Sequence, residues 1–306
     1  MGLTKKILIT GVNGLLGQSL VSILSKDASF KIFGLSKGDN RIPYPPEDFV
    51  YYGVDILNKE KLEKIILKLK PDVIVHTAAL TQIDECEQNK ESCWKINVEG
   101  TQHLLDITEK TNSHFIFLST DFVFDGLNGP YQEKDIPNPV SHYGHTKLIA
   151  EQLVQSRLIP WTIVRTVLVF GHHSGMTRTN ILTWVVRSLK NEQTIKVVND
   201  QFRTPTFVDD LARAVMYIAH QQKTGIYHIS GAEMCSVFEF VLTIAEVWGL
   251  PKTFIEPISS KKLNQTAQRP PKTGFVIFKA QIDLGYSPHT LKQGLNILKQ
   301  QLKGIL

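Results

Sequence analysis

Tyr143 and Lys147 lie four residues apart in the stretch Tyr143-Gly144-His145-Thr146-Lys147, near the start of a helical pattern at about residues 141–155. Because an i,i+4 spacing places two side chains on one face of a helix, the two groups are expected to be neighbours. A tyrosine with a pKa of about 10 is a poor acid–base group at neutral pH, but a neighbouring ammonium group lowers that pKa. The pair could therefore donate a proton to a carbonyl oxygen while a hydride reaches the carbon. The same spacing is also common in surface pairs on helices.

A hydroxyl group that could act on the same carbonyl follows a predicted buried strand. Ser119-Thr120-Asp121 ends the apolar run His114–Ser119. The carboxyl ends of parallel strands form the edge of an α/β sheet where ligands bind. A threonine hydroxyl at that edge can hydrogen-bond a carbonyl oxygen and polarise it. Thr120 is therefore a candidate to act together with Tyr143.

Three glycines spaced as GxxGxxG follow the first predicted strand and open the first predicted helix. Gly11 permits a tight turn, Gly14 lets a pyrophosphate approach the backbone, and Gly17 lets the helix pack closely on the strand. The free N–H groups and the positive dipole end of the helix favour that phosphate. The turn therefore indicates a dinucleotide-binding site, although an ordinary glycine-rich turn is the alternative. The candidate cofactor contacts in this turn are Gly11, Asn13, Gly14, Leu15, Leu16 and Gly17.

The residues after the second predicted strand bear on the choice of cofactor. An acidic side chain there would hydrogen-bond the ribose 2′-hydroxyl of NAD, whereas a basic one would accept the 2′-phosphate of NADP. The strand end carries no acid, while Ser36, Lys37 and Arg41 lie nearby. We therefore predict a preference for NADP(H), with NAD(H) as the alternative. In that alternative Lys37 and Arg41 are solvated surface charges.

Two further strand ends carry residues suited to the cofactor. Asp55-Ile56 closes the third predicted strand, and its carboxylate could accept a hydrogen bond from an adenine amino group. An aspartate that caps the next helix is an equal alternative. Ala78 and Ala79 close the fourth predicted strand, where small side chains leave room for the cofactor but also suit plain packing.

The candidate residues must be positioned by alternating strands and helices. Because strands separated by helices join through right-handed βαβ crossovers, this order predicts an α/β fold, a Rossmann-type doubly wound parallel sheet covered on both faces. The predicted strands are Lys6–Thr10, Lys31–Leu35, Val50–Val54, Asp72–His76 and His114–Ser119, and the predicted helices are Leu15–Leu24, Lys59–Lys70 and Asn89–Thr111.

The alternation weakens beyond a predicted strand at Trp161–Phe170, where strand–helix pieces and many breakers indicate a smaller α/β substrate-binding domain. We assign residues 1–165, plus about 199–222, to the NAD(P)-binding domain. The smaller domain takes about 166–198 and 223–306.

The composition of the 306 residues, with 42% apolar residues, 21% charged residues and a net charge of +5, is that of a globular protein. Three cysteines without a CxxC pair argue against a disulfide framework. His172-His173 lacks a spaced third ligand, so no metal is expected. No apolar run approaches about 18 residues and no nucleic-acid motif occurs, so neither membrane nor nucleic acid is an expected partner. We expect a cytoplasmic protein that acts on a small molecule.

Together these motifs resemble those of the extended short-chain dehydrogenases/reductases, and more narrowly those of the dTDP-4-dehydrorhamnose reductases. The resemblance covers residues 5 to about 220, and the stretch Ser119 to Gly126 is its most specific part. It rests on the glycine turn, Asn97-Val98-Glu99-Gly100-Thr101, Ser119-Thr120-Asp121-Phe122-Val123-Phe124-Asp125-Gly126, Tyr143 to Lys147, Arg165-Thr166, and Arg203 to Ala212.

The resemblance implies NAD(P)H-dependent reduction of a keto group on a nucleotide-linked sugar. Tyr143 would be the proton donor, Lys147 would lower its pKa and hold the nicotinamide ribose, and Thr120 would orient the keto oxygen. Asn97 would join the cofactor-binding residues. The implied substrate contacts are Thr120, Asp121, Arg203 and Arg269, of which Arg269 could equally be an exposed loop arginine.

One departure from the family pattern and two other functions stay open. The rhamnose enzymes carry a sugar-contacting Trp where this chain has Leu168, which puts the identity of the sugar in question. An epimerase or dehydratase that retains its NAD is one alternative, but Asp121 is followed by Phe122 and not by the glutamate that related dehydratases use. A regulatory subunit like the beta subunit of methionine adenosyltransferase is the other. The long helices could also pair two copies in a homodimer.

Overall fold

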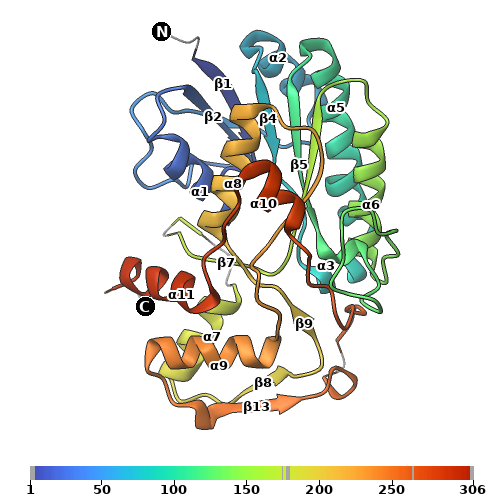
Figure 1. Ribbon diagram of the computed structural model, residues 1–306. Coiled ribbons are helices and arrows are strands. Elements are labelled where there is room, and N and C mark those ends of the chain that lie inside the picture. The colour runs from blue at the N-terminus through green and yellow to red at the C-terminus, as the bar shows by residue number, and fades with distance from the viewer. Residues whose placement is uncertain (1–3, 174, 177–179, 264, 304–306) are drawn as a thin grey trace.

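The computed structural model describes residues 4–173, 175–176, 180–263 and 265–303. Seven of the described strands form one parallel sheet in the order β11-β6-β5-β4-β1-β2-β3, which confirms the predicted Rossmann-type fold (Figure 1). These strands are β1 (Lys5–Thr10), β2 (Phe30–Ser36), β3 (Val50–Gly53), β4 (Val73–His76), β5 (His114–Thr120), β6 (Trp161–Thr166) and β11 (Gly225–Ile229).

Helices cover both faces of the sheet, because successive side chains of a strand point to opposite faces. In β1, Ile7 and Ile9 pack into one core and Leu8 packs into the other, and all three are fully buried. The first core is closed by α1 (Leu15–Leu24), α8 (Val208–Gln221) and α10 (Phe278–Leu284), and the second by α2 (Lys59–Leu69), α5 (Gly100–Thr111) and α6 (His142–Gln155). Near-continuous apolar strands are therefore what this sheet requires.

The predicted helix Asn89–Thr111 is interrupted in the structure. It consists of α4 (Lys90–Trp94), one π-helical turn η1 (Lys95–Glu99) and α5, and it follows the short helix α3 (Ile83–Gln88). Single π-helical turns inside α-helices are frequent at functional sites. This turn carries Asn97, whose side chain points into the protein and is buried.

The strand order reverses between β1 and β4, with β2 and β3 on one side and β5, β6 and β11 on the other. The crevice outside the carboxyl ends at such a point is where doubly wound sheets bind ligands. Thr10 and His76 are register partners there, and Gly11 follows with a positive φ of 68°. A Cβ atom on Gly11 would come 2.6 Å from the nitrogen of Ala78, so only glycine fits.

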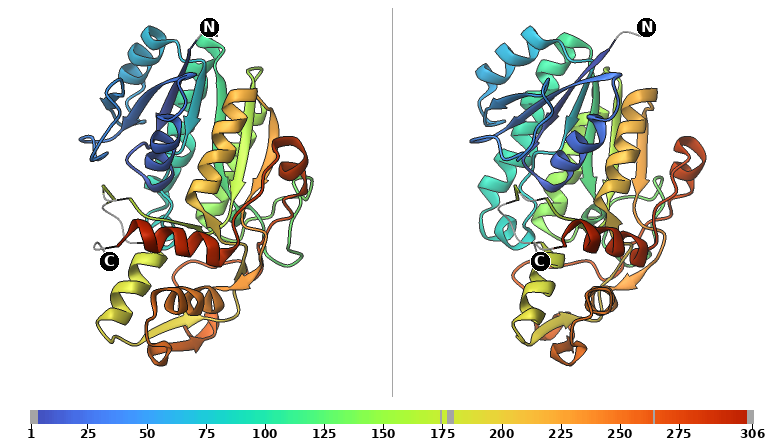
Figure 2. Two further views of the ribbon diagram at one scale, coloured as in Figure 1. Left: turned by 60° about the vertical axis from the view of Figure 1, so that its left-hand side comes forward. Right: turned by 90° about the vertical axis from the view of Figure 1, so that its left-hand side faces the viewer.

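A smaller part lies beyond the carboxyl ends of the central strands, at the bottom of Figure 1 and in both views of Figure 2. Its apolar core joins helices α7 and α9 with strand β8 and the final helix α11. Its elements are β7 (Val169–Phe170), α7 (Ile181–Lys190), β8 (Ile195–Val198), β9 (Phe202–Arg203), β10 (Thr206–Phe207), β12 (Cys235–Ser236), α9 (Val237–Trp248), η3 (Lys252–Phe254), β13 (Ile255–Ile258), η4 (Ser260–Lys262) and α11 (Leu291–Gln301).

Two predicted boundaries differ from the structure. The predicted strand Trp161–Phe170 divides into β6 and β7, and Leu168 between them has a φ of 35° that breaks the extended backbone. Residues after 223 were assigned to the smaller domain, yet β11 pairs with β6 in the central sheet and α10 packs in its first core. That part of the assignment is wrong, because β11 is hydrogen-bonded to β6 as an edge strand of the central sheet. Strands β9 and β10 also depart from the assignment of 199–222 to the NAD(P)-binding domain, because they pair with β12 and β7 in the smaller part. The rest of the division stays a prediction. None of the helices in the described ranges is both long and apolar enough to cross a membrane.

A buried ion pair joins α6 to the central sheet. The Arg165 guanidinium on β6 donates to both carboxylate oxygens of Glu151 on α6, at 3.0 Å from Nε to Oε1 and 2.7 Å from Nη2 to Oε2. Both side chains are at most 2% exposed. Because α6 carries Tyr143 and Lys147, this pair fixes the helix that presents both groups.

We predict that Arg165→Met lowers the free energy of unfolding by about 3 kcal/mol, because it leaves the Glu151 carboxylate buried without its partner. Urea unfolding measures the change. The control is Lys252→Met, which removes an exposed ion pair with Glu246 and should leave the urea midpoint unchanged. Equal midpoints for the wild type and Arg165→Met would contradict the prediction.

Candidate functional site

A cavity of about 1070 Å³ lies between the carboxyl ends of the central strands and the smaller part. Sixteen of the twenty candidate residues line it, and the exceptions are Gly17, Asn97, Arg203 and Arg269. The smaller part contributes Leu168, Val169, Met176 and Asn180 to its wall. The sixteen are Gly11, Asn13, Gly14, Leu15, Leu16, Ser36, Lys37, Arg41, Asp55, Ile56, Ala78, Ala79, Thr120, Asp121, Tyr143 and Lys147.

The glycine turn presents backbone to this cavity. Gly14 is the N-cap of α1, its nitrogen donates to the Gly11 carbonyl at 2.8 Å, and the first turn of the helix holds no acidic residue. Such a helix end suits a phosphate group. Gly17 has a different place: a Cβ atom there would lie 2.6 Å from the Cα of Val12, so this glycine serves helix–strand packing and does not line the cavity.

The loop after β2 is held by side chains from outside it. The Asn13 side chain donates to the Asp39 carbonyl at 2.9 Å and accepts from the Arg41 amide at 3.0 Å. The Tyr51 hydroxyl on β3 donates to the Gly38 carbonyl at 2.7 Å. No sequence motif marks Tyr51, because it is a lone tyrosine on a short strand. The contacts fix the backbone that carries Lys37 and Arg41.

Asp55 does not cap the following helix. Asn58 does so, by accepting from the Lys61 amide at 3.1 Å. Asp55 instead accepts from the Leu57 amide at 3.0 Å and forms an ion pair with Lys37 at 3.0 Å. Burial raises the pKa of Asp55, but the Leu57 amide and the Lys37 ammonium outweigh burial and lower that pKa below its usual value. The carboxylate therefore lies beside the loop after β2, which carries Lys37.

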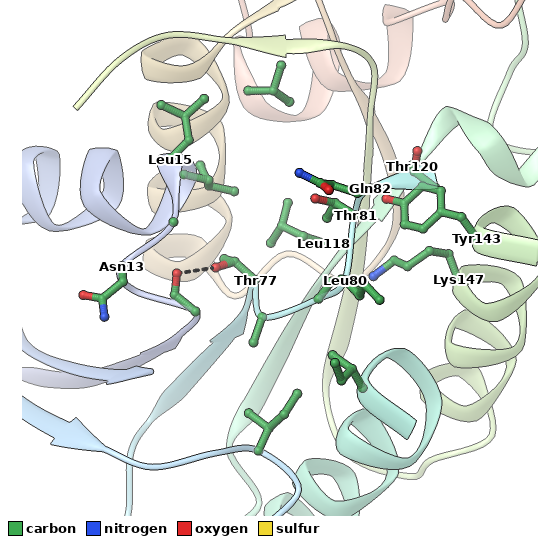
Figure 3. A pocket seen from close by; sticks show the side chains of 18 of the residues that line it. Asn13, Leu15, Thr77, Leu80, Thr81, Gln82, Leu118, Thr120, Tyr143 and Lys147 are labelled. Atoms are coloured by element: carbon green, nitrogen blue, oxygen red, sulfur yellow. Dashed lines mark hydrogen bonds between the residues drawn. The ribbon is translucent and has the colours of Figure 1, made fainter. Parts of the chain in front are cut away.

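Thr120, Tyr143 and Lys147 point towards one region of the cavity (Figure 3). Ser141 caps α6 by accepting from the Gly144 amide at 3.2 Å. A Cβ atom on Gly144 would come within 2.1 Å of the Phe122 carbonyl oxygen, so the first turn of α6 lies directly against the chain after β5. This close approach brings Tyr143 to Thr120.

Burial controls the ionisation of Tyr143. It raises the pKa of the phenol above its usual value, the Thr120 hydroxyl partly offsets this rise, and the Asp121 carboxylate adds to it. The prediction that Lys147 lowers this pKa is not met in the structure, since desolvation dominates. The phenol therefore keeps its proton at neutral pH, which is the form that a proton donor needs.

Lys147 is buried without an ion-pair partner among the described residues. Its Nζ lies 4.0 Å from the centre of the Phe117 ring. Burial lowers the pKa of Lys147 to about 7, while the Glu151 carboxylate and the Cys93 thiol oppose that shift. Glu151 itself is committed to Arg165. Burial therefore favours the neutral amine form of Lys147 far more than in water.

Arg203 was predicted to bind substrate but is engaged by the protein itself. Its Nε lies 3.5 Å from Asp121 Oδ2, and its guanidinium donates to the Pro270 carbonyl at 2.8 Å. Thr273 also hydrogen-bonds the Asp121 carboxylate. Burial raises the pKa of Asp121, and Arg203 opposes that rise. Arg203 therefore ties the segment 270–273 to the end of β5 and is not part of the cavity wall.

Arg269 joins the same C-terminal segment to helix α3. Its guanidinium donates to both Asp84 oxygens, at 2.7 and 3.1 Å, and the Ala267 amide donates to Asp84 at 3.0 Å. Hydrogen bonding to Arg269 lowers the pKa of Asp84, although burial opposes this. A substrate phosphate would have to displace this pair, so the structure gives Arg269 a structural partner in place of the predicted contact.

Asn97 does not line the cavity but holds two segments of its wall in place. Its amide accepts from the Leu80 nitrogen at 2.8 Å and donates to the Leu80 carbonyl at 3.0 Å and to Thr146 Oγ1 at 3.1 Å. Asn97 therefore positions the segment after β4 relative to helix α6. Thr81 and Gln82 in that wall were missed, because no motif marks them.

Two observations test whether a dinucleotide fits. The buried Ser119 hydroxyl lines the cavity and has no hydrogen-bond partner in the part of the chain that the structure describes. A Cβ atom on Gly14 would meet only the Gly11 carbonyl, at 3.1 Å, so the turn is open towards a ligand. Both fit a polar, phosphate-bearing cofactor.

The described residues contain no group of three His, Cys, Asp or Glu arranged for a metal. His173, one of the two adjacent histidines, contacts Ser19 at 2.7 Å.

This sheet order, the glycine turn at its switch point and the Thr-Tyr-Lys set in one cavity define an extended short-chain dehydrogenase/reductase. The chain belongs to the RmlD substrate binding domain family, whose model matches residues 5–303.

Several known proteins are similar over nearly the whole chain. The dTDP-4-dehydrorhamnose reductase of Aggregatibacter actinomycetemcomitans is 29% identical over 96% of this chain and 98% of its own. The methionine adenosyltransferase 2 subunit beta of Danio rerio is 29% identical over 87% of this chain and 81% of its own. The crystal structure of dTDP-4-dehydrorhamnose reductase from Bacillus anthracis in complex with NADP has a TM-score of 0.84 at 26% identity, covering 98% of this chain and 100% of that one.

The buried lysine makes stability depend on pH in a defined way. Its pKa is about 7 in the folded protein and about 10.4 when unfolded, so between these values the unfolded chain binds more protons. Its contribution to stability is therefore least favourable below pH 7 and improves as pH rises towards 10.

We predict that Lys147→Met is more stable than the wild type at pH 6–7 by a few kcal/mol, and that the difference shrinks as the pH approaches 10. Urea unfolding of both proteins without ligand, at five pH values, measures this difference. A difference that is constant with pH would show that the ammonium group is not desolvated in the folded protein.

Proposed function

We propose that this protein reduces a keto group of a nucleotide-linked sugar with NADPH, as a dTDP-4-dehydrorhamnose reductase does. The observation that carries the proposal is the convergence of Thr120, Tyr143 and Lys147 in a cavity that also contains the glycine turn. The family and the similar reductases support the same activity. The substrate class is a sugar nucleotide. A cytoplasmic location and a homodimer stay predictions.

Each residue has a defined part in this reaction. NADPH supplies the hydride when it is bound. Gly11, Gly14 and the amino end of α1 would bind its pyrophosphate, and Ser119 has a free hydroxyl for a polar group. Tyr143 holds the proton that the keto oxygen receives, and Thr120 donates a hydrogen bond that places that oxygen. A protonated Lys147 would bind the ribose hydroxyl groups.

The regulatory alternative rests on the similarity to the methionine adenosyltransferase 2 beta subunit. The reductase is favoured because the proton donor, its neighbouring hydroxyl and the lysine all line the cavity. The dehydratase alternative still lacks its glutamate, since Phe122 follows Asp121 and packs its ring 5.9 Å from that of Tyr143.

We predict that Tyr143→Phe lowers kcat about 100- to 10,000-fold, because it removes the proton donor and keeps the ring. Oxidation of NADPH at 340 nm with a panel of 4-keto sugar nucleotides measures the rate. Fluorescence titration with NADPH should give nearly the same Kd as in the wild type. The control is Tyr44→Phe, which changes a 93% exposed tyrosine outside the cavity and should keep full activity. Full activity of Tyr143→Phe would refute the assignment, and a wild type that reduces none of the panel would favour the regulatory role.

We predict that kcat/KM is higher with NADPH than with NADH, because Lys37 and Arg41 lie on the loop that would meet the 2′-phosphate. The double variant Lys37→Ala/Arg41→Ala should lose about tenfold of that preference, mainly through KM for NADPH. Steady-state rates with both cofactors test this. A wild type that prefers NADH would overturn the cofactor assignment without affecting the proposed reaction.

A further inference from the structure

Gln82 is a polar side chain in the cavity wall that none of the roles above uses. It follows β4, immediately before α3, lines the cavity and is exposed to it. Its side chain makes no cap hydrogen bond to α3, and the hydrogen bonds of the described residues leave its amide without a partner. Figure 3 shows Gln82 beside Thr81 in the cavity wall that also holds Thr120 and Tyr143, with its amide directed into the cavity. An unpartnered amide at this place is available to a ligand.

The backbone that carries Gln82 is firmly held. Asn97 fixes Leu80 through both its nitrogen and its carbonyl, at 2.8 and 3.0 Å. On the other side of Gln82, Arg269 and the Ala267 amide hold Asp84. The Gln82 carbonyl also accepts from the Cys86 amide at 2.9 Å. Because the backbone is held on both sides, the Gln82 side chain starts from a defined place in the cavity wall, and only its own rotamer freedom is lost when it binds.

The position of Gln82 relative to the proton donor defines what it can contact. Tyr143 and Thr120 would fix the keto oxygen, so Gln82, which lines the same cavity beside them, can reach a substituent on a nearby ring carbon. An amide both donates and accepts hydrogen bonds, which matches a hydroxyl group. Of the described residues that line the cavity, only Phe122 and Tyr143 are aromatic. Leu168 provides no ring for stacking, so hydrogen bonding is left to orient the sugar.

We propose that Gln82 is a specificity-determining residue that binds a hydroxyl group on the sugar carbon next to the keto carbon. This inference rests on the proposed reduction of a keto sugar nucleotide. A site that hydrogen-bonds a substrate hydroxyl discriminates against the analogue that lacks it, because the amide is then left without a partner. Gln82 acts on the choice of substrate and takes no part in the transfer of hydride or proton.

The experiment compares two substrates in three proteins. The substrates are a 4-keto sugar nucleotide with a hydroxyl on the adjacent ring carbon and its deoxy analogue. The proteins are the wild type, Gln82→Leu and Gln88→Leu, which changes an exposed glutamine at the end of the same helix outside the cavity. NADPH titration of each protein checks that the fold and the cofactor site are intact.

We expect Gln82→Leu to raise KM for the hydroxylated substrate about 5- to 10-fold, with kcat within about twofold, and to leave KM for the deoxy analogue unchanged. Gln88→Leu should match the wild type on both substrates. Equal changes on both substrates, or no change on either, would overturn the role of Gln82 while the proposed reduction stands. A wild type that reduces neither substrate would overturn the proposed reduction, and this inference with it.

Discussion

The close approach of α6 to the chain after β5 is the contact on which the candidate site depends. At Gly144 the two backbones are so near that a Cβ atom would lie 2.1 Å from the Phe122 carbonyl oxygen. Thr120 belongs to the strand end, and Tyr143 and Lys147 belong to the helix, so any separation here would pull the set apart. The buried Arg165–Glu151 pair holds the same helix from the other end. The site is thus positioned by regular elements, which give more precise geometry than loops.

A chain of buried polar contacts links the glycine turn to that helix. Thr10 Oγ1 lies 2.7 Å from His76 Nδ1, and His76 Nε2 lies 3.0 Å from Thr101 Oγ1. Thr101 donates to the Asn97 carbonyl at 2.7 Å, and the Asn97 side chain reaches Thr146 on α6 at 3.1 Å. Burial lowers the pKa of His76 to about 3, so its ring is neutral and offers one donor and one acceptor. Because a buried polar group without a partner is costly, this fully paired chain ties the glycine turn to helix α6, which carries Tyr143.

Local signals predicted six of the seven described strands of the sheet and sixteen of the residues that line the cavity. Apolar runs predicted the strands because doubly buried strands need them, and the glycine turn predicted the cofactor end because its backbone geometry admits only glycine at Gly11. Contacts between distant segments could not be predicted in this way. Nothing near Arg203 or Arg269 in sequence shows that Asp121 and Asp84 will pair with them. Gln82 lacks a signal for the same reason, since only the folded wall brings it into one cavity with Tyr143.

Burial pushes both titratable groups of the pair towards their neutral forms, which suits a site that changes charge during reaction. Desolvation raises the pKa of Tyr143 and lowers that of Lys147, so neither gains its charge from the other before a ligand binds. In the proposed reaction Tyr143 would give its proton to the keto oxygen, and a phenolate would form near Lys147 in a medium of low polarity. An adjacent negative charge raises the pKa of an ammonium group, so Lys147 would then hold its proton more firmly and stabilise the phenolate. On this proposal the lysine would act after the proton has begun to move, because desolvation dominates the pKa of the resting tyrosine.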